Sequence, residues 1–127
     1  MRKRYSRNKY GNRKVTRNGI KFDSMAEAAY YPLAVAYAVE HDLELRLQEP
    51  FILQEAFRVA GKRKQAIKYI PDFTFWDGNR LAKVVDVKGP QTEGFKIKAK
   101  WFCYKYQTEL ILAKYDYRTG LFTETAF

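Results

Sequence analysis

The stretch from residue 69 to residue 89 constrains the fold of this chain more than any other. It holds two apolar, β-rich runs on either side of residues 77–79, whose Asp-Gly-Asn sequence is typical of a β-hairpin turn. Asp72 lies near the start of the first run, and Asp86 and Lys88 lie near the end of the second. Because side chains alternate between the two faces of a strand, we expect Asp86 and Lys88 on the same face.

The antiparallel hairpin should bring Asp72 back beside Asp86 at one end of the ladder. Two crowded carboxylates repel each other unless they share a proton or a cation, and Mg²⁺ prefers such oxygen ligands. The turn decides the arrangement: a loop of three residues, 77–79, places Asp72 on the face of Asp86, whereas two or four residues place it on the opposite face. Alternatively, Asp86 and Lys88 form an ion pair on a solvated strand, and Asp72 is a turn residue.

The positive charge of the chain is concentrated at its N-terminus. The 127 residues contain 24 Lys and Arg against 14 Asp and Glu, and eight of the basic residues but no acidic one fall within residues 1–17. We therefore expect a basic, flexible arm over residues 1–17 and one folded domain over residues 18–127. The arm either follows DNA phosphates or only keeps the chain soluble. Its expected DNA contacts are Arg2, Lys3, Arg4, Arg7, Lys9, Arg13 and Lys14.

The remaining composition bears on the compartment of the protein. Cys103 is the only cysteine, so the chain cannot form an internal disulfide. No signal peptide is visible, and the longest apolar run, residues 28–39, is too short and too interrupted to span a membrane. We expect a protein of the reducing cytoplasm with no membrane partner.

The hydrophobic pattern predicts an α/β domain with helices on the faces of a sheet. A first helix is expected over residues 24–42, packed against the sheet and bent or broken at Pro32. A second is expected over residues 92–106. Besides the central hairpin, strands are expected at 15–16, 20–22, 43–48, 51–59, 110–115 and 121–127.

Several charged residues on these elements have two interpretations. Glu27 fits the third position of a capping box, from which it would bond the backbone of Ser24. Lysines on the second helix lie off its apolar face, where they contact phosphates or are merely solvated. A basic loop at residues 61–64 either touches DNA or is a solvated tip.

Some reaction classes are poorly supported by this sequence. His41, the only histidine, falls at the end of the expected first helix, where it would support the helix C-terminus, so Ser-His-Asp, Cys-His and His-rich metal sites are poorly supported. The chain also lacks a Gly-rich phosphate-binding loop. A site of carboxylates and lysine remains, and such a site suits phosphodiester hydrolysis.

The ordered set of motifs resembles a nuclease family. Pro71-Asp72, followed after 13 further residues by Asp86-Val87-Lys88, resembles the PD-(D/E)XK signature. Residues 19–112 are similar to small phage endonucleases akin to RecU-type Holliday-junction resolvases, although RecU-type chains are longer and carry further basic segments. The similar segments are Phe22-Asp23-Ser24-x-x-Glu27, Leu47-Gln48-x-Pro50-Phe51, Ile67-Lys68-Tyr69-x-x-Asp72-Phe73, Asp86-Val87-Lys88-Gly89-x-x-Thr92 and Phe95-Lys96-Ile97-Lys98-x-Lys100.

The resemblance implies a single domain with a restriction-endonuclease-like core, that is, a mixed β-sheet flanked by helices. The implied catalytic residues are Glu27, Asp72, Asp86 and Lys88. One or two Mg²⁺ or Mn²⁺ ions would be held by Asp72, Asp86 and the Val87 carbonyl, with Glu27 as the ligand of a second ion. Lys88 would orient the attacking water or stabilise the developing charge. The implied DNA contacts within the domain are Thr92, Lys96, Lys98 and Lys100.

We therefore predict an Mg²⁺-dependent endodeoxyribonuclease that cuts branched DNA, such as a four-way junction, in phage recombination, repair or packaging. Cutting two strands symmetrically implies a homodimer. For a phage-encoded chain the compartment is the cytoplasm of the bacterial host. Two other functions stay open: a non-catalytic nucleic-acid-binding module, in which the carboxylates and lysine form only a structural network, and a restriction-type nuclease with a sequence preference.

Overall fold

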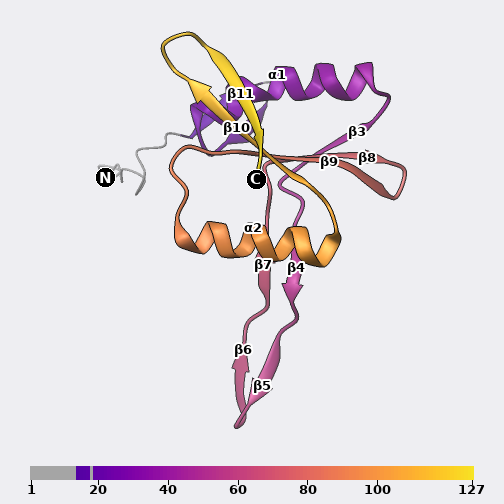
Figure 1. Ribbon diagram of the computed structural model, residues 1–127, viewed down its shortest axis with the longest axis vertical. Helices are drawn as coiled ribbons and strands as arrows, with labels where there is room; N and C mark the ends of the chain where they lie inside the picture. The colour runs from indigo at the N-terminus through magenta and orange to yellow at the C-terminus, as the bar shows by residue number, and fades with distance from the viewer. Residues whose placement is uncertain (1–13, 18) are drawn as a thin grey trace.

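The computed structural model describes residues 14–17 and 19–127, which form one α/β domain with a mixed sheet and two helices (Figure 1). The short hairpin predicted near the N-terminus is present as β1 (Val15–Arg17) and β2 (Ile20–Phe22). The last three residues assigned to the basic arm therefore form a strand, and Lys14 lies exposed just before it. The other predicted arm contacts lie outside the described residues: Arg2, Lys3, Arg4, Arg7, Lys9 and Arg13.

The central sheet has five strands in the order β11-β10-β9-β8-β3. Their bounds are β3 Glu44–Leu47, β8 Phe73–Asp77, β9 Arg80–Val87, β10 Leu110–Asp116 and β11 Leu121–Ala126. Strands β9 and β10 run parallel and the other neighbours run antiparallel, so the sheet is mixed as predicted. The parallel pair is joined through helix α2 (Glu93–Tyr106), because parallel neighbours need a long crossover connection.

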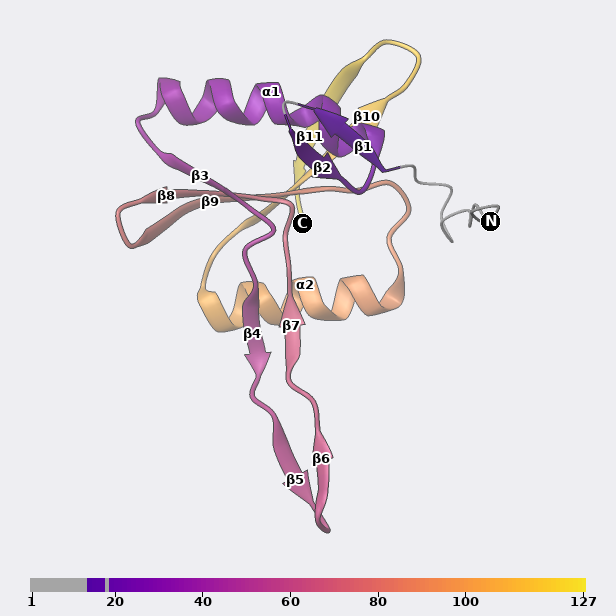
Figure 2. The ribbon, with the colours of Figure 1, turned by 180° about the vertical axis from the view of Figure 1, so that it is seen from behind.

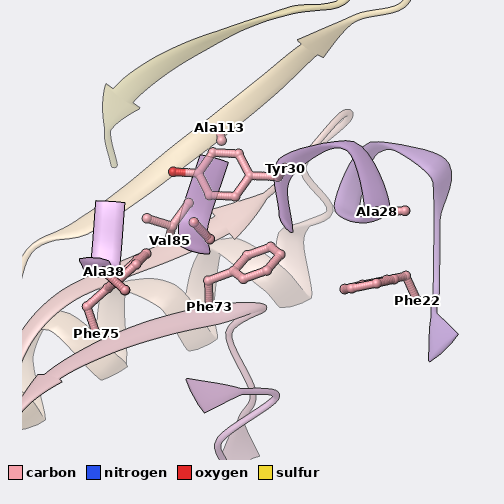
Figure 3. Packing of buried hydrophobic residues seen from close by; sticks show 9 residues of the cluster. Phe22, Ala28, Tyr30, Ala38, Phe73, Phe75, Val85 and Ala113 are labelled. Atoms are coloured by element: carbon pink, nitrogen blue, oxygen red, sulfur yellow. The ribbon is translucent and has the colours of Figure 1, made fainter. Parts of the chain in front are cut away.

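The two helices cover opposite faces of this sheet (Figures 1 and 2). On one face, α1 (Met25–Glu40) packs Tyr30 near Phe73 and Val85, and Ala38 near Phe75, as Figure 3 shows. On the other face, Ala99 and Phe102 of α2 join a second cluster with Val84 and Leu110. Val84 and Val85 therefore face opposite layers, as the alternation of side chains along a strand requires.

Helix α1 is not broken at Pro32, although a break was one of the two predicted outcomes. It continues through this exposed proline. A proline in a helix interior removes one backbone hydrogen bond, and packing of the flanking residues supplies most helical stability in a folded protein. Ala34 and Ala38, which follow Pro32, are both buried on the sheet. The outer side of the same helix exposes Leu33 and Val39.

Residues 51–69 form a second arm, called the arm from here on, that extends past α2 and away from the sheet (Figures 1 and 2). The single strand predicted over residues 51–59 is divided into β4 (Phe51–Gln54) and β5 (Phe57–Val59). These strands pair with β7 (Ile67–Tyr69) and β6 (Lys62–Lys64) respectively. The predicted basic loop is thus mainly strand β6, at the outer end of the arm.

Among the residues described, no helix combines the length and the apolar character needed to cross a membrane.

Candidate active site at the end of the central hairpin

The turn of the β8–β9 hairpin is shorter than predicted. Asp77 pairs with Arg80, so the loop consists of the two residues Gly78 and Asn79 rather than of three. Gly78 has a φ of +60°, a conformation that glycine adopts at little cost at the first central position of a tight hairpin turn. By itself, a two-residue loop would place Asp72 on the face opposite Asp86.

A β-bulge corrects this register. Phe75 pairs with Lys83, whereas Trp76 pairs with Leu81, so Ala82 is an extra residue in β9. Beyond the bulge, on the side away from the turn, Phe73 lies opposite Val85. One residue further from the turn, the two chain segments carry Asp72 and Asp86. The bulge therefore has the effect that a third loop residue was predicted to have, and it brings Asp72 and Asp86 to one face.

Asp72 and Asp86 form a buried carboxyl pair. Their exposed fractions are 8% and 3%, and the two carboxyl groups are close enough to hydrogen bond. Burial raises the pKa of both, and the charge of Asp72 raises the pKa of Asp86 further. Asp86 is the more strongly affected of the two, with a pKa raised to about 8. An ion pair on a solvated strand is therefore not what the structure contains.

Glu27 reaches this pair from the first turn of α1. Its carboxyl group lies close to that of Asp72, and burial raises its pKa. Ser24 caps the helix as predicted, since its Oγ accepts from the Glu27 backbone N at 3.1 Å. Glu27 itself differs from the prediction, because its Oε2 accepts from the Asp23 backbone N at 3.3 Å rather than from that of Ser24. Glu27 thus contributes both to the helix start and to the carboxylate group.

Lys88 follows β9 and lies near the same group. Its ammonium sits 4.5 Å from the centre of the Phe95 ring, and its charge lowers the pKa of Asp86. The Lys88 backbone N donates to the carbonyl of Ala113 at 3.0 Å, which fixes the chain at this point. The structure thus brings together the four residues predicted as catalytic.

Two further residues contact the carboxyl pair and were not assigned by sequence reasoning. The Tyr69 hydroxyl donates to Asp86 Oδ2 at 2.7 Å, and Gln48 Nε2 donates to Asp72 Oδ1 at 3.0 Å. The Val87 backbone N donates to Asp72 Oδ2 at 2.9 Å. Tyr69 and Gln48 both lie in segments that resemble the nuclease family, which is the signal that could have singled them out.

A cavity of about 490 Å³ opens beside Glu27 and Lys88. Asp72 does not line it but lines a smaller cavity of about 80 Å³, together with Glu27 and Gln48. Glu27, Val87 and Lys88 line the larger cavity, called the cavity from here on, and so does Thr92, whose Oγ1 caps α2 by accepting from the Phe95 backbone N at 3.1 Å. The remaining predicted DNA contacts on α2 do not line the cavity: they are the exposed Lys96, Lys98 and Lys100. Lys96 instead pairs with Glu93 at 3.4 Å.

The donor set suits a hard divalent cation. Among the described residues, no group of three or more His, Cys, Asp or Glu side chains is arranged to hold a metal ion. Mg²⁺, however, commonly binds proteins through only one or two carboxylates and keeps several waters. Asp72 and Asp86 are two neighbouring buried carboxyl groups with raised pKa values, and a cation can offset their mutual repulsion as a proton does. These residues therefore fit such an ion.

Residues 7–118 match a protein family described as "Protein of unknown function (DUF1064)". The match spans most of the chain, so the chain belongs to this family. No curated protein and no solved structure matches the sequence.

Proposed function

We propose that this protein is a metal-dependent DNA endonuclease of the PD-(D/E)XK type with a restriction-endonuclease-like core. One observation carries the proposal: a β-bulge places Asp72 beside the buried Asp86, and the neighbouring Glu27 and Lys88 line a cavity. Burying two carboxyl groups side by side destabilises a fold, and it is retained most often where the groups perform chemistry. The mixed sheet with a helix on each face agrees with the proposed core.

The carboxylates would hold the ion, and Lys88 would act on the substrate. Asp72, Asp86 and the Val87 carbonyl are the proposed ligands, with Glu27 available for a second ion. A bound divalent cation would lower the pKa of a water molecule and offset charge on the phosphate. In the hydrolysis, water adds to phosphorus, the bond from phosphorus to one sugar oxygen breaks, and that oxygen takes up a proton. Lys88 would orient the water or stabilise the charge that develops on the phosphate oxygens.

The surroundings favour an approaching phosphate. Both helices begin at the cavity, since their N-cap residues Ser24 and Thr92 line it. The N-terminus of a helix carries partial positive charge and attracts anions. The net charge of +10 favours DNA in the same way at longer range. We further propose a branched substrate and a homodimer, because two symmetric nicks require two active sites related by a two-fold axis.

Cleavage of synthetic DNA tests this function. The full-length protein is incubated with a four-way junction, a matched linear duplex and a single strand, each with Mg²⁺, Mn²⁺ or EDTA. We expect paired nicks in the junction that require the metal. Cutting of all three substrates would keep the nuclease and reject the preference for branched DNA. Binding without cutting under every metal condition would reject the nuclease and favour a non-catalytic DNA-binding module.

A sequence preference is tested separately. The same protein is incubated with a random-sequence duplex library, and the cleaved ends are sequenced. We expect no consensus around the cut. A strong consensus in linear duplex would instead indicate the restriction-type nuclease.

A further inference from the structure

One wall of the cavity has no part in the proposed chemistry. It is formed by Lys114 and Tyr115 of β10 and by Tyr117, which follows that strand. Glu27 and Lys88 line the same cavity from α1 and from the end of β9. A group bound against this wall would therefore share the cavity with Glu27 and Lys88, which lie next to the carboxyl pair.

The aromatic part of this wall is held in place by its surroundings. The rings of Tyr115 and Tyr117 meet edge to face with their centroids 4.7 Å apart, and Tyr115 packs in turn on Phe122 at 4.7 Å. Asp116 fixes the turn that follows: its Oδ1 accepts from the Arg118 backbone N at 2.9 Å. Tyr117 nevertheless remains 65% exposed, so one side of a well-supported ring is open to a ligand.

The residue types of this wall match the two parts of a nucleotide. An aromatic ring stacks on any nucleobase, and an ammonium group contacts a phosphate. Lys114 is exposed and lines the cavity together with the tyrosines. A base that is paired and stacked within a duplex presents no free face to a tyrosine. The wall therefore suits an unpaired nucleotide.

We propose that Lys114 and Tyr117 form a subsite for an unpaired nucleotide next to the scissile phosphate. Tyr117 stacks on the base, and Lys114 contacts the adjoining phosphate. This inference rests on the proposed endonuclease function and deepens it, because it names the structural feature by which a branched substrate is preferred. Such a substrate offers unpaired or easily unpaired bases at its branch point, and a continuous duplex does not.

Fluorescence of 2-aminopurine measures the stacking directly. The base is placed unpaired at the branch point of a four-way junction, and the full-length protein is titrated in EDTA so that no cutting occurs. Stacking on Tyr117 should quench the fluorescence. We expect Tyr117→Ala to abolish the quenching and to weaken binding by roughly 5- to 150-fold, the range of one base–aromatic contact. Tyr117→Phe should retain both.

Two controls separate the subsite from a general loss of binding. Tyr104→Ala removes a tyrosine that is 77% exposed on α2 but does not line the cavity, and it should change neither quenching nor affinity. A continuous duplex without an unpaired base should bind Tyr117→Ala and the unchanged protein alike. Equal losses on the two DNAs, or no loss on either, would overturn the subsite.

Lys114 is tested through salt dependence. Lys114→Ala should reduce the slope of log affinity against log salt by about 0.7 to 0.9, the contribution of one phosphate contact, whereas Lys114→Arg should restore it. An unchanged slope would remove Lys114 from the subsite.

The outcome for the subsite can be told apart from that for the nuclease. If the unchanged protein cuts DNA and Tyr117→Ala cuts it with the same KM, the nuclease stands and the subsite fails. If the subsite is correct, Tyr117→Ala raises KM with little change in kcat, because the contact is made equally in the bound substrate and in the transition state. If no DNA is cut but Tyr117-dependent quenching persists, the nuclease fails and a nucleotide-binding site remains.

Discussion

Two hairpins of this molecule, both with two-residue turns, place their charges in opposite surroundings. The outer β5–β6 hairpin of the arm is exposed along both strands and carries Arg58 and the three cations of Lys62–Lys64. The central β8–β9 hairpin is largely buried, and its open end holds the Asp72–Asp86 pair. Cations that stay in water cost the fold little, whereas two buried carboxyls destabilise it unless neighbours compensate.

The compensation is visible around the buried pair. Tyr69, Gln48 and the Val87 backbone N–H all donate to the two carboxyl groups. In these two hairpins, the burial of a charged group says more about function than its sign or the number of such groups. The arm cations fit many roles, whereas the carboxyl pair calls for a specific one.

The largest expected effect is the loss of cleavage on removing Asp86. Asp86→Ala should lower the rate by about a thousandfold or more, because a proposed metal ligand disappears. The single-turnover cleavage rate is the measurement, with circular dichroism to verify folding. Asp77→Asn is the matched control, since Asp77 is exposed at the other end of the same hairpin. Full activity of a folded Asp86→Ala protein would refute the site.

Lys88→Ala should reduce cleavage by roughly a hundred- to a thousandfold, as expected when a charge that stabilises the transition state is lost. Because Lys88 is not a proposed ligand, divalent-ion binding should persist. Calorimetric titration beside the cleavage assay separates the two functions. Loss of ion binding together with activity would show that Lys88 acts through the carboxyl pair rather than on the substrate.

Tyr69→Phe should lower cleavage by roughly ten- to a hundredfold, the usual effect of removing a hydrogen bond to a metal ligand. The ring still packs on Phe102, so the loss of stability should not exceed that of one buried hydrogen bond, about 1 to 3 kcal/mol. Tyr106→Phe is the control, because its hydroxyl lies in the same layer but donates to the Ile52 carbonyl at 2.8 Å. Equal effects of the two substitutions would indicate a packing role for Tyr69.

The carboxyl pair should also make stability depend on pH. The pKa of Asp86 is raised in the folded state, so its protonated form stabilises the metal-free fold at low pH, and this contribution is lost as pH rises through the raised pKa. We expect the free energy of unfolding to fall by at least about 1.4 kcal/mol between about pH 5 and pH 9, corresponding to one pKa unit or more. Urea unfolding at each pH measures it.

The matched variant in this experiment is Asp86→Asn, which keeps the shape of the side chain and cannot ionise. Its pH dependence should be flatter, and in the absence of metal it should be more stable than the unchanged protein above neutral pH. Identical pH profiles of the two proteins would mean that Asp86 ionises as it does in water.

The smallest effects are expected from substitutions in the β5–β6 hairpin of the arm. Arg63→Ala and Lys64→Ala should each change the free energy of unfolding by less than about 0.5 kcal/mol, because both side chains are exposed in the β5–β6 hairpin. Urea unfolding measures this change. A loss above about 1.5 kcal/mol in either variant would show that the arm cations have structural partners, and it would weaken the contrast between the two hairpins.

Local pattern was enough to predict most of the fold. Turn residues and alternation located the central hairpin, and the apolar faces located both helices and the β10 and β11 strands. Pattern also indicated that Asp72 and Asp86 meet. These features depend on residues that are close in sequence, or on a single tight turn.

The details that fix the site depend on contacts distant in sequence. The bulge at Ala82 changes the register without any marker residue, because Ala82 lies in an otherwise regular strand. Tyr69 reaches Asp86 because β7 packs against α2. Gln48 reaches Asp72 because β3 pairs with β8. The division of the predicted strand 51–59 arises likewise from the separate pairings of β4 and β5.

The most direct measurement is a calorimetric titration of the protein with Mg²⁺ at pH 7, repeated in two buffers with different ionisation enthalpies. We predict saturable binding that displaces a proton from the carboxyl pair. The buffer takes up this proton, so the apparent binding enthalpies in the two buffers should differ by about the difference between the ionisation enthalpies of the buffers. Asp86→Asn should bind weakly and release no proton. If the unchanged protein does not bind Mg²⁺, or if Asp86→Asn binds it equally well, the carboxyl pair of Asp72 and Asp86 is not a metal site.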